Sequence, residues 1–244
     1  SPRWRGALPR ANEMTPTIKK MMARPEMAAL LIFLALFVLF SVLNDRFLTS
    51  GNMTVYLQPI PELAIVAMGI TVLIIAGEFD LSVGSVFGLS PMVTVLLMQS
   101  GWPTAVAILI GLAVAALIGF CNGLITLRLK IPSFIATLGM MLILKGLSLV
   151  ISGTKPIYFN DTPSFPLLST GSLIGGVIPG LPVPNGVVIL FVLALVISWV
   201  LNRTVLGRYC FALGSNEEAV RLSGVNADGW KVAIYALAGG ICGI

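Results

Sequence analysis

The sequence predicts an all-α fold, a polytopic bundle of helices that cross a membrane. Of the 244 residues, 57% are apolar and only 10% are charged, against about 45–50% and about 25% in a typical soluble domain. This composition provides too little polar surface for a soluble globule and too much hydrophobicity for a disordered chain. Apolar stretches close to the ~20 residues that a membrane-spanning helix needs also recur along the chain.

The apolar stretches define about six full spans and the start of a seventh. The first is longer than the ~7–15-residue apolar core of a signal peptide and has no A-x-A site after it, so we expect a retained anchor. The third contains Gly84, Gly88 and Pro91, which predict a kinked or interrupted helix. The predicted spans are residues 27–43, 59–77, 81–98, 103–127, 131–152 and 187–201, with a seventh that begins near residue 230.

The two ends of the sequence predict a fragment. The last apolar stretch, residues 232–244, is too short to cross the hydrocarbon core, and Ser1 is not an initiator residue. We therefore expect a chain that is incomplete at its C-terminus. It would consist of a basic tail over residues 1–25 and a transmembrane domain over residues 26–244, which includes a cytoplasmic segment at 202–229.

The basic residues predict the orientation of the chain. The net charge is +5, and the tail alone carries that whole excess. Because cytoplasmic loops are enriched in lysine and arginine, the tail is placed in the cytoplasm. Alternating spans then put Arg128, Lys130 and the segment at 202–229 inside. Residues 153–186, with Lys155 as their only basic residue, fall outside.

Composition and motifs exclude several function classes. The chain has no histidine, which removes histidine-based catalysis and histidine-ligated metals. Its three cysteines are far apart and form no C-x-x-C pair, so neither a cysteine metal site nor a disulfide framework is expected. There is no phosphate-binding P-loop, no nucleophile–base pair in an aqueous segment and no nucleic-acid face. We therefore expect no catalytic residue, metal or cofactor.

The first candidate site lies between the second and third spans, where Glu78 and Asp80 separate two apolar stretches. An acid in the middle of a bilayer costs at least ~2.5 kcal/mol, so it usually marks function or faces a cavity. Alternatively, the acids belong to a short cytoplasmic turn and Asp80 caps the next helix. The two interpretations are compatible if the turn lies at the inner mouth of a translocation route.

Further polar residues in the spans are candidates for the same route. Intramembrane polar side chains often only bond a neighbouring helix. Lys145, inside the fifth span, either snorkels or pairs within the bundle, or it contacts substrate. The residues predicted for the translocation path are Glu78, Asp80, Ser82, Ser85, Asn122, Ser133 and Thr137.

The second candidate site is the cytoplasmic segment at residues 206–224. Ser215 and Glu218 form a capping-box pattern, Glu217 would lie in the first turn, and Gly224 is a natural stop. This predicts a helix of about two turns, which is too short to be stable alone. It should dock through Ala219, Val220 and Leu222, either on its own bundle or on a partner protein.

These motifs resemble a known family. Residues 76–85, AGEFDLSVGS, resemble the G-x-D-L-S-V-G-S signature of ribose-type ABC-transporter permeases. NG at 122–123 and IPSFIATLG at 131–139 resemble its N-G…P-x-F-I-A-T-L-G block. Residues 204–225 are similar to its T-x-L-G-R…G-x-N-x-x-A-x-R-L-S-G-I segment. The blocks keep the family's order and cover residues 60–240. Glu78 and Lys145 are departures from the family's pattern.

The resemblance implies a membrane subunit of a bacterial inner-membrane importer for a monosaccharide, a related small polyol or a sugar signal. Such a permease would act by alternating access with a second permease copy, cytoplasmic ABC ATPase subunits and an extracytoplasmic solute-binding protein. The ATPase-coupling residues implied are Leu206, Gly207, Arg208, Gly214, Asn216, Glu217, Glu218, Ala219, Arg221, Leu222, Ser223 and Gly224.

Two other functions remain open at this point. An ion-coupled secondary transporter would use Glu78 and Asp80 as its coupling acids. A membrane scaffold would use residues 206–224 only as a docking platform, without moving a substrate.

Overall fold

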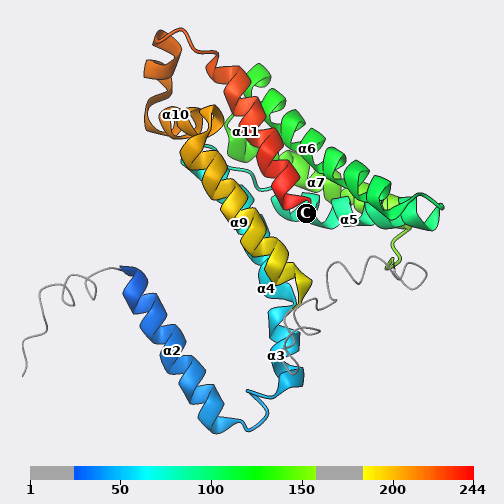
Figure 1. Ribbon diagram of the computed structural model, residues 1–244. Helices are drawn as coiled ribbons and strands as arrows, with labels where there is room; N and C mark the ends of the chain where they lie inside the picture. The colour runs from blue at the N-terminus through cyan, green and yellow to red at the C-terminus, as the bar shows by residue number, and fades with distance from the viewer. Residues whose placement is uncertain (1–24, 158–183) are drawn as a thin grey trace, which may run out of the picture. The chain divides into compact units, whose positions relative to one another are not determined.

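The computed structural model describes residues 25–157 and 184–244, and every regular element in these two ranges is an α-helix (Figure 1). The basic tail predicted for residues 1–25 lies, except for its last residue, outside the described residues. So does most of the predicted outer segment at 153–186. By its internal contacts the chain divides into two units, Ser1–Met53 and Thr54–Ile244.

The first unit contains the predicted anchor. Helix α2 (Pro25–Leu43) is followed by a turn and by the start of α3 (Ser50–Leu57). The ring of Phe37 meets that of Phe47 edge-on, with centroids 5.5 Å apart. Large apolar side chains are exposed along the whole length of α2. A helix that is apolar on all faces and exposed is typical of a segment that lipid covers.

The second unit is a helical bundle in which α11 is the central element. Helix α11 packs most extensively along α6 and also contacts α4, α5 and α10. Its residues Ile234, Tyr235 and Ala238 are buried in the larger apolar core, to which α4 and α10 also contribute. The helices of this unit are α4 (Pro59–Ile75), α5 (Val83–Gln99), α6 (Thr104–Leu129), α7 (Ser133–Ser152), α9 (Asn185–Arg203), α10 (Val205–Leu222) and α11 (Ala227–Cys242).

The fold class predicted from the sequence is confirmed. Each predicted span coincides with a helix to within a few residues, and the predicted seventh is α11. Among the described residues, four helical stretches are long and apolar enough to cross a membrane: Ser50–Ile75, Thr104–Leu129, Ser133–Ser152 and Asn185–Arg203. Shorter apolar helical stretches are Met27–Leu43 in α2 and Val83–Gln99, which is α5. The chain is thus a polytopic helical protein.

A kinked or an interrupted helix is predicted for the third span, and the structure excludes only the interrupted form. Helix α5 is continuous from Val83 to Gln99 with Pro91 inside it, so it is not interrupted. A proline removes one backbone hydrogen bond, and burial between neighbouring helices allows such a helix to persist. Here α5 packs against both α6 and α7, and Ser90 Oγ donates to the Gly243 carbonyl at 2.8 Å.

Glycines allow α6 and α11 to approach closely. A Cβ atom at Gly119 would lie 2.2 Å from the Tyr235 carbonyl oxygen, and one at Gly239 would lie 2.5 Å from that of Ala115. Only residues without a side chain fit at such a contact, which is a common arrangement between membrane helices. This close packing fixes the position of α11 and therefore of Asp228 and Lys231 in its first two turns.

Candidate functional site

The turn between α4 and α5, residues 77–82, points its two acids into the protein. Gly77 has a positive φ of 80°, and the Glu78 N–H donates back to the Leu73 carbonyl at 3.0 Å. This tight reversal leaves the Phe79 side chain 54% exposed, whereas Glu78 and Asp80 are only 8% and 5% exposed. Buried acids need partners, and both have them.

Asp80 is held by the start of α5 and by α6. One carboxylate oxygen accepts the backbone N–H and the hydroxyl of Ser82, each at 2.7 Å. The other accepts Asn122 Nδ2 at 2.9 Å. The predicted cap needs a correction, because Ser82 occupies the N-cap position. Asp80 lies two residues earlier and binds the Ser82 N–H, as aspartate does in local turns.

Two hydroxyl groups of α7 accept hydrogen bonds from backbone N–H groups of the same turn. The Phe79 N–H donates to Ser133 Oγ at 3.3 Å, and the Leu81 N–H donates to Thr137 Oγ1 at 3.1 Å. Ser85 Oγ donates to the Met141 carbonyl at 3.1 Å. The structure therefore gathers all the residues predicted for the translocation path around one turn. Their role in moving a substrate stays a prediction.

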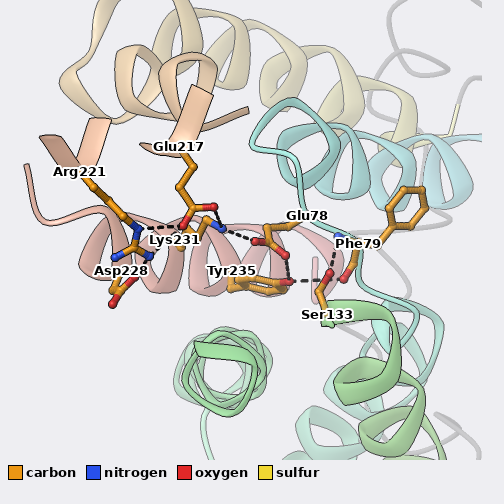
Figure 2. Close-up of polar contacts among 8 residues, drawn as sticks. All are labelled: Glu78, Phe79, Ser133, Glu217, Arg221, Asp228, Lys231 and Tyr235. Carbon is orange, nitrogen blue, oxygen red and sulfur yellow. Dashed lines mark hydrogen bonds and ion pairs between the residues drawn. The ribbon is translucent and has the colours of Figure 1, made fainter. Parts of the chain in front are cut away.

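Glu78 binds two residues of α11 that were not predicted as site residues. Lys231 Nζ lies 2.6 Å from Glu78 Oε1, and the Tyr235 hydroxyl donates to Glu78 Oε2 at 3.1 Å (Figure 2). Lys231 and Tyr235 are one turn apart, so both face Glu78. The sequence does contain a signal for this ion pair, since a lysine near the start of an apolar helix and a buried acid each require a counter-charge. It does not say which acid pairs with which lysine.

The predicted coupling segment, residues 206–224, is built from two helical pieces joined at Asn216. The backbone of Asn216 is extended, with φ −158° and ψ 95°, inside α10. Its side chain accepts the Ala219 N–H at 3.0 Å, so Asn216 caps the second piece. The predicted capping box at Ser215 is therefore wrong by one residue, because asparagine caps as well as serine. Gly224 has a φ of 80° after the helix end, as predicted.

Ion pairs attach the second piece of α10 to the bundle (Figure 2). Glu217 Oε2 lies 2.6 Å from Lys231 Nζ, and Arg221 Nη2 lies 2.8 Å from Glu217 Oε1. Arg221 also pairs with Asp228. Partial burial favours a higher pKa for Glu217, but the hydrogen bonds from Lys231 and Arg221 outweigh it and lower that pKa. The hydrogen bonds that Arg221 donates to Asp228 and Glu217 raise the pKa of Arg221.

Only part of this segment packs on its own bundle. Val220 joins the apolar core, whereas Ala219 and Leu222 are exposed, Leu222 to 83%. Packing back on the bundle thus uses one of the three predicted apolar contacts. Of the implied coupling residues, Gly207 is buried and Leu206 and Glu217 are half-buried. The exposed ones are Arg208, Gly214, Asn216, Glu218, Ala219, Arg221, Leu222, Ser223 and Gly224.

Comparison with known proteins identifies the family. The profile of a family described as "Branched-chain amino acid transport system / permease component" matches residues 52–244. The chain belongs to this permease family. The permease is 36% identical over 214 residues to "Ribose import permease protein RbsC" of Escherichia coli (strain K12), covering 88% of this chain and 65% of the relative. No solved structure matches it.

Other curated relatives are also import permeases. The permease is 32% identical over 220 residues to "Fructose import permease protein FrcC" of Rhizobium meliloti, covering 88% of this chain and 60% of the relative. It is 32% identical over 222 residues to "Autoinducer 2 import system permease protein LsrC" of Enterobacter sp. (strain 638), covering 91% of this chain and 62% of the relative. The chain thus spans slightly less than two thirds of these relatives. The resemblance to ribose-type permeases is confirmed.

A cavity adjoins both polar clusters of the permease. Its volume is about 740 Å³, and its lining includes Glu78, Ser133, Arg221, Asp228 and Lys231. It therefore lies where the turn at 77–82, the start of α7 and the coupling segment meet.

Lys145 of the permease lies on an exposed face of α7. Within the described part of the chain it makes no hydrogen bond or ion pair. Pairing inside this bundle, one of the predicted alternatives, is therefore not observed among those residues.

Proposed function

We propose that this permease is the transmembrane subunit of an ATP-binding-cassette importer that moves a monosaccharide or related small polyol across a bacterial inner membrane. The observation that carries the proposal is the similarity, over 88% of the chain, to import permeases whose names specify ribose and fructose. The family description names branched-chain amino acids. The relatives' names give the narrower guide to substrate, since they describe individual proteins.

The arrangement of α10 supports coupling to a separate ATPase. The second piece of α10 is anchored to the bundle through Glu217 and Val220, while Ala219 and Leu222 are exposed. A short helix held at one face and apolar on the other is suited to dock on a second protein. In this proposal ATP is hydrolysed by cytoplasmic ATPase chains, and the permease itself contributes no catalytic residue.

The remaining partners follow from the proposed importer. A second permease copy would complete the transmembrane part, and an extracytoplasmic solute-binding protein would deliver the sugar. The permease would rest in the lipid bilayer with its N-terminal tail in the cytoplasm. The polar cluster around the turn at 77–82 would support the inner part of the translocation path, beside the cavity described above.

The buried acids favour this function over an ion-coupled transporter. A coupling carboxylate must exchange its ion during each cycle. Glu78 is occupied by Lys231 and Tyr235, and Asp80 by Ser82 and Asn122. Both acids therefore act as internal counter-charges and acceptors in this conformation.

The proposal is tested by removing the docking element. The intact permease would be reconstituted into liposomes with its ATPase and binding protein, and sugar uptake would be measured with ATP on the ATPase side. Deletion of residues 217–223 should abolish both ATPase co-purification and uptake. A variant with this deletion that still binds the ATPase and imports sugar at the wild-type rate would refute the assigned docking element.

A further inference from the structure

We propose that Glu78, Lys231 and Glu217 form a relay, here called the Lys231 bridge, that transmits movement of the coupling segment to the turn at residues 77–82. Lys231 and Glu78 are positioning residues in this role, since neither touches ATP. The inference rests on the proposed function, because it assigns a route by which the ATPase would act on the membrane bundle.

The bridge joins two parts of the molecule that are distant in sequence. Lys231 is only 8% exposed, and its ammonium group lies 2.6 Å from Glu78 and 2.6 Å from Glu217. Glu78 belongs to the turn between α4 and α5, while Glu217 opens the second piece of α10. An ammonium group has three donors, so one lysine can hold both acids at once.

The inner end of the bridge continues to α7 (Figure 2). The Tyr235 hydroxyl donates to Glu78 at 3.1 Å and lies 3.4 Å from the Phe79 carbonyl oxygen. The Phe79 N–H in turn donates to Oγ of Ser133, the first residue of α7. A displacement of Glu78 therefore acts on the peptide that fixes the turn to α7.

The outer end of the bridge is placed to sense the partner. Glu217 directly follows the extended residue Asn216, at which α10 changes direction. Movement of the piece over residues 217–222 about this point carries the Glu217 carboxylate with it. The exposed Ala219 and Leu222 lie in that same piece, so a protein that pushes on them also moves Glu217.

The charges of the bridge determine which variants are informative. Removing Lys231 alone leaves Glu78 as a buried charge without its counter-ion, which is strongly destabilising. Glu217 is different, because its side chain is 37% exposed and Lys231 keeps Glu78 after its loss. Glu217→Ala therefore cuts the relay at its outer end. The double variant E78Q/K231M removes the buried pair together, which is often tolerated.

The test measures coupling rather than activity alone. Sugar uptake and ATP hydrolysis would be recorded in the same proteoliposomes, which contain the intact permease, its ATPase and the binding protein. E78Q/K231M, which leaves the docking element unchanged, should still bind the ATPase and hydrolyse ATP. Because Glu217 lies in the docking element, ATPase binding by Glu217→Ala is measured separately. Sugar moved per ATP should fall by about two- to thirtyfold, the range typical of residues in a coupling network. Glu217→Asp, which keeps the charge, should recover part of that loss.

A charge-matched control is Glu62→Ala, since Glu62 is an exposed acid in the first turn of α4 and lies outside the bridge. Glu62→Ala should keep the wild-type ratio of sugar moved per ATP hydrolysed. The relay is overturned if both bridge variants keep that ratio, or if Glu217→Ala acts only by abolishing ATPase binding. A wild-type protein without ATP-dependent uptake would instead refute the proposed function itself.

Discussion

Gly214 lies so close to Ile75 that a Cβ atom at residue 214 would come within 1.8 Å of the Ile75 carbonyl oxygen. This contact joins the first piece of α10 to the last residue of α4. Ile75 and Gly214 come shortly before Glu78 and Glu217, the two ends of the Lys231 bridge, so the contact holds the segment at 206–224 beside the turn that carries Glu78. The packing there leaves no space for any side chain.

Gly214→Ala should therefore destabilise the permease. A methyl group forced against backbone typically costs about 1–3 kcal/mol, because α4 or α10 must shift. Thermal unfolding in detergent should show a lower midpoint. Gly146→Ala is the control, since a Cβ atom there meets nothing within 4 Å. It should be neutral or stabilise α7 by up to about 1 kcal/mol. Equal midpoints for the two variants would contradict the close contact.

Asp80 and Asn122 provide a second prediction, based on graded substitutions. Asp80→Ala removes the acceptor of the Ser82 N–H and hydroxyl, at a cost of about 1–3 kcal/mol for each unsatisfied group. The Asn122 amide loses one of its two acceptors and keeps Ser82 Oγ. Asp80→Asn should cost less. Its oxygen can still accept from Ser82, and Asn122 can turn its Oδ1, which has no partner among the described residues, toward the new amide. The thermal unfolding midpoint should be highest for the wild type, lower for Asp80→Asn and lowest for Asp80→Ala. A lower midpoint for Asp80→Asn than for Asp80→Ala would refute this role of Asp80.

The lowered pKa of Glu217 predicts how docking of the second piece of α10 responds to pH. The docked state favours the charged carboxylate of Glu217. The stability that this carboxylate adds to docking is therefore present above the ordinary carboxyl pKa of about 4.3, and it is lost as pH falls through the lowered pKa of Glu217. A spin label at Ser223→Cys should report constant mobility from about pH 5 to 8 and greater mobility below about pH 4. Glu217→Gln should remove that acid transition. A transition centred near neutrality would contradict this assignment.

The predicted orientation is testable with a matched pair of exposed serines. Ser223 follows the coupling segment and should face the cytoplasm, whereas Ser100 joins α5 to α6 and should face outward. A membrane-impermeant maleimide applied to whole spheroplasts should label Ser100→Cys but not Ser223→Cys, and inverted vesicles should show the opposite. Labelling of the unsubstituted protein measures the background from the native cysteines. Labelling of Ser223→Cys from outside would reverse the topology.

The sequence was sufficient for the helices but not for the pairing of charges. Spans such as α6 and α7 were predictable because a bilayer requires long uninterrupted apolar stretches. The cap of the second piece of α10 was misplaced by one residue, since Ser215 and Asn216 are both good caps. Lys231 was missed because its partner Glu78 is 153 residues away in the chain, and no local pattern encodes that contact.

The most direct test of the central claim is the energy source of sugar uptake. The intact permease would be reconstituted with its ATPase and binding protein, and radiolabelled sugar would be followed with ATP, without ATP, and with ATP plus an uncoupler. Uptake that requires ATP and is unaffected by the uncoupler is the predicted result. Uptake that proceeds without ATP and collapses with the uncoupler would show an ion-coupled transporter and contradict the proposed function.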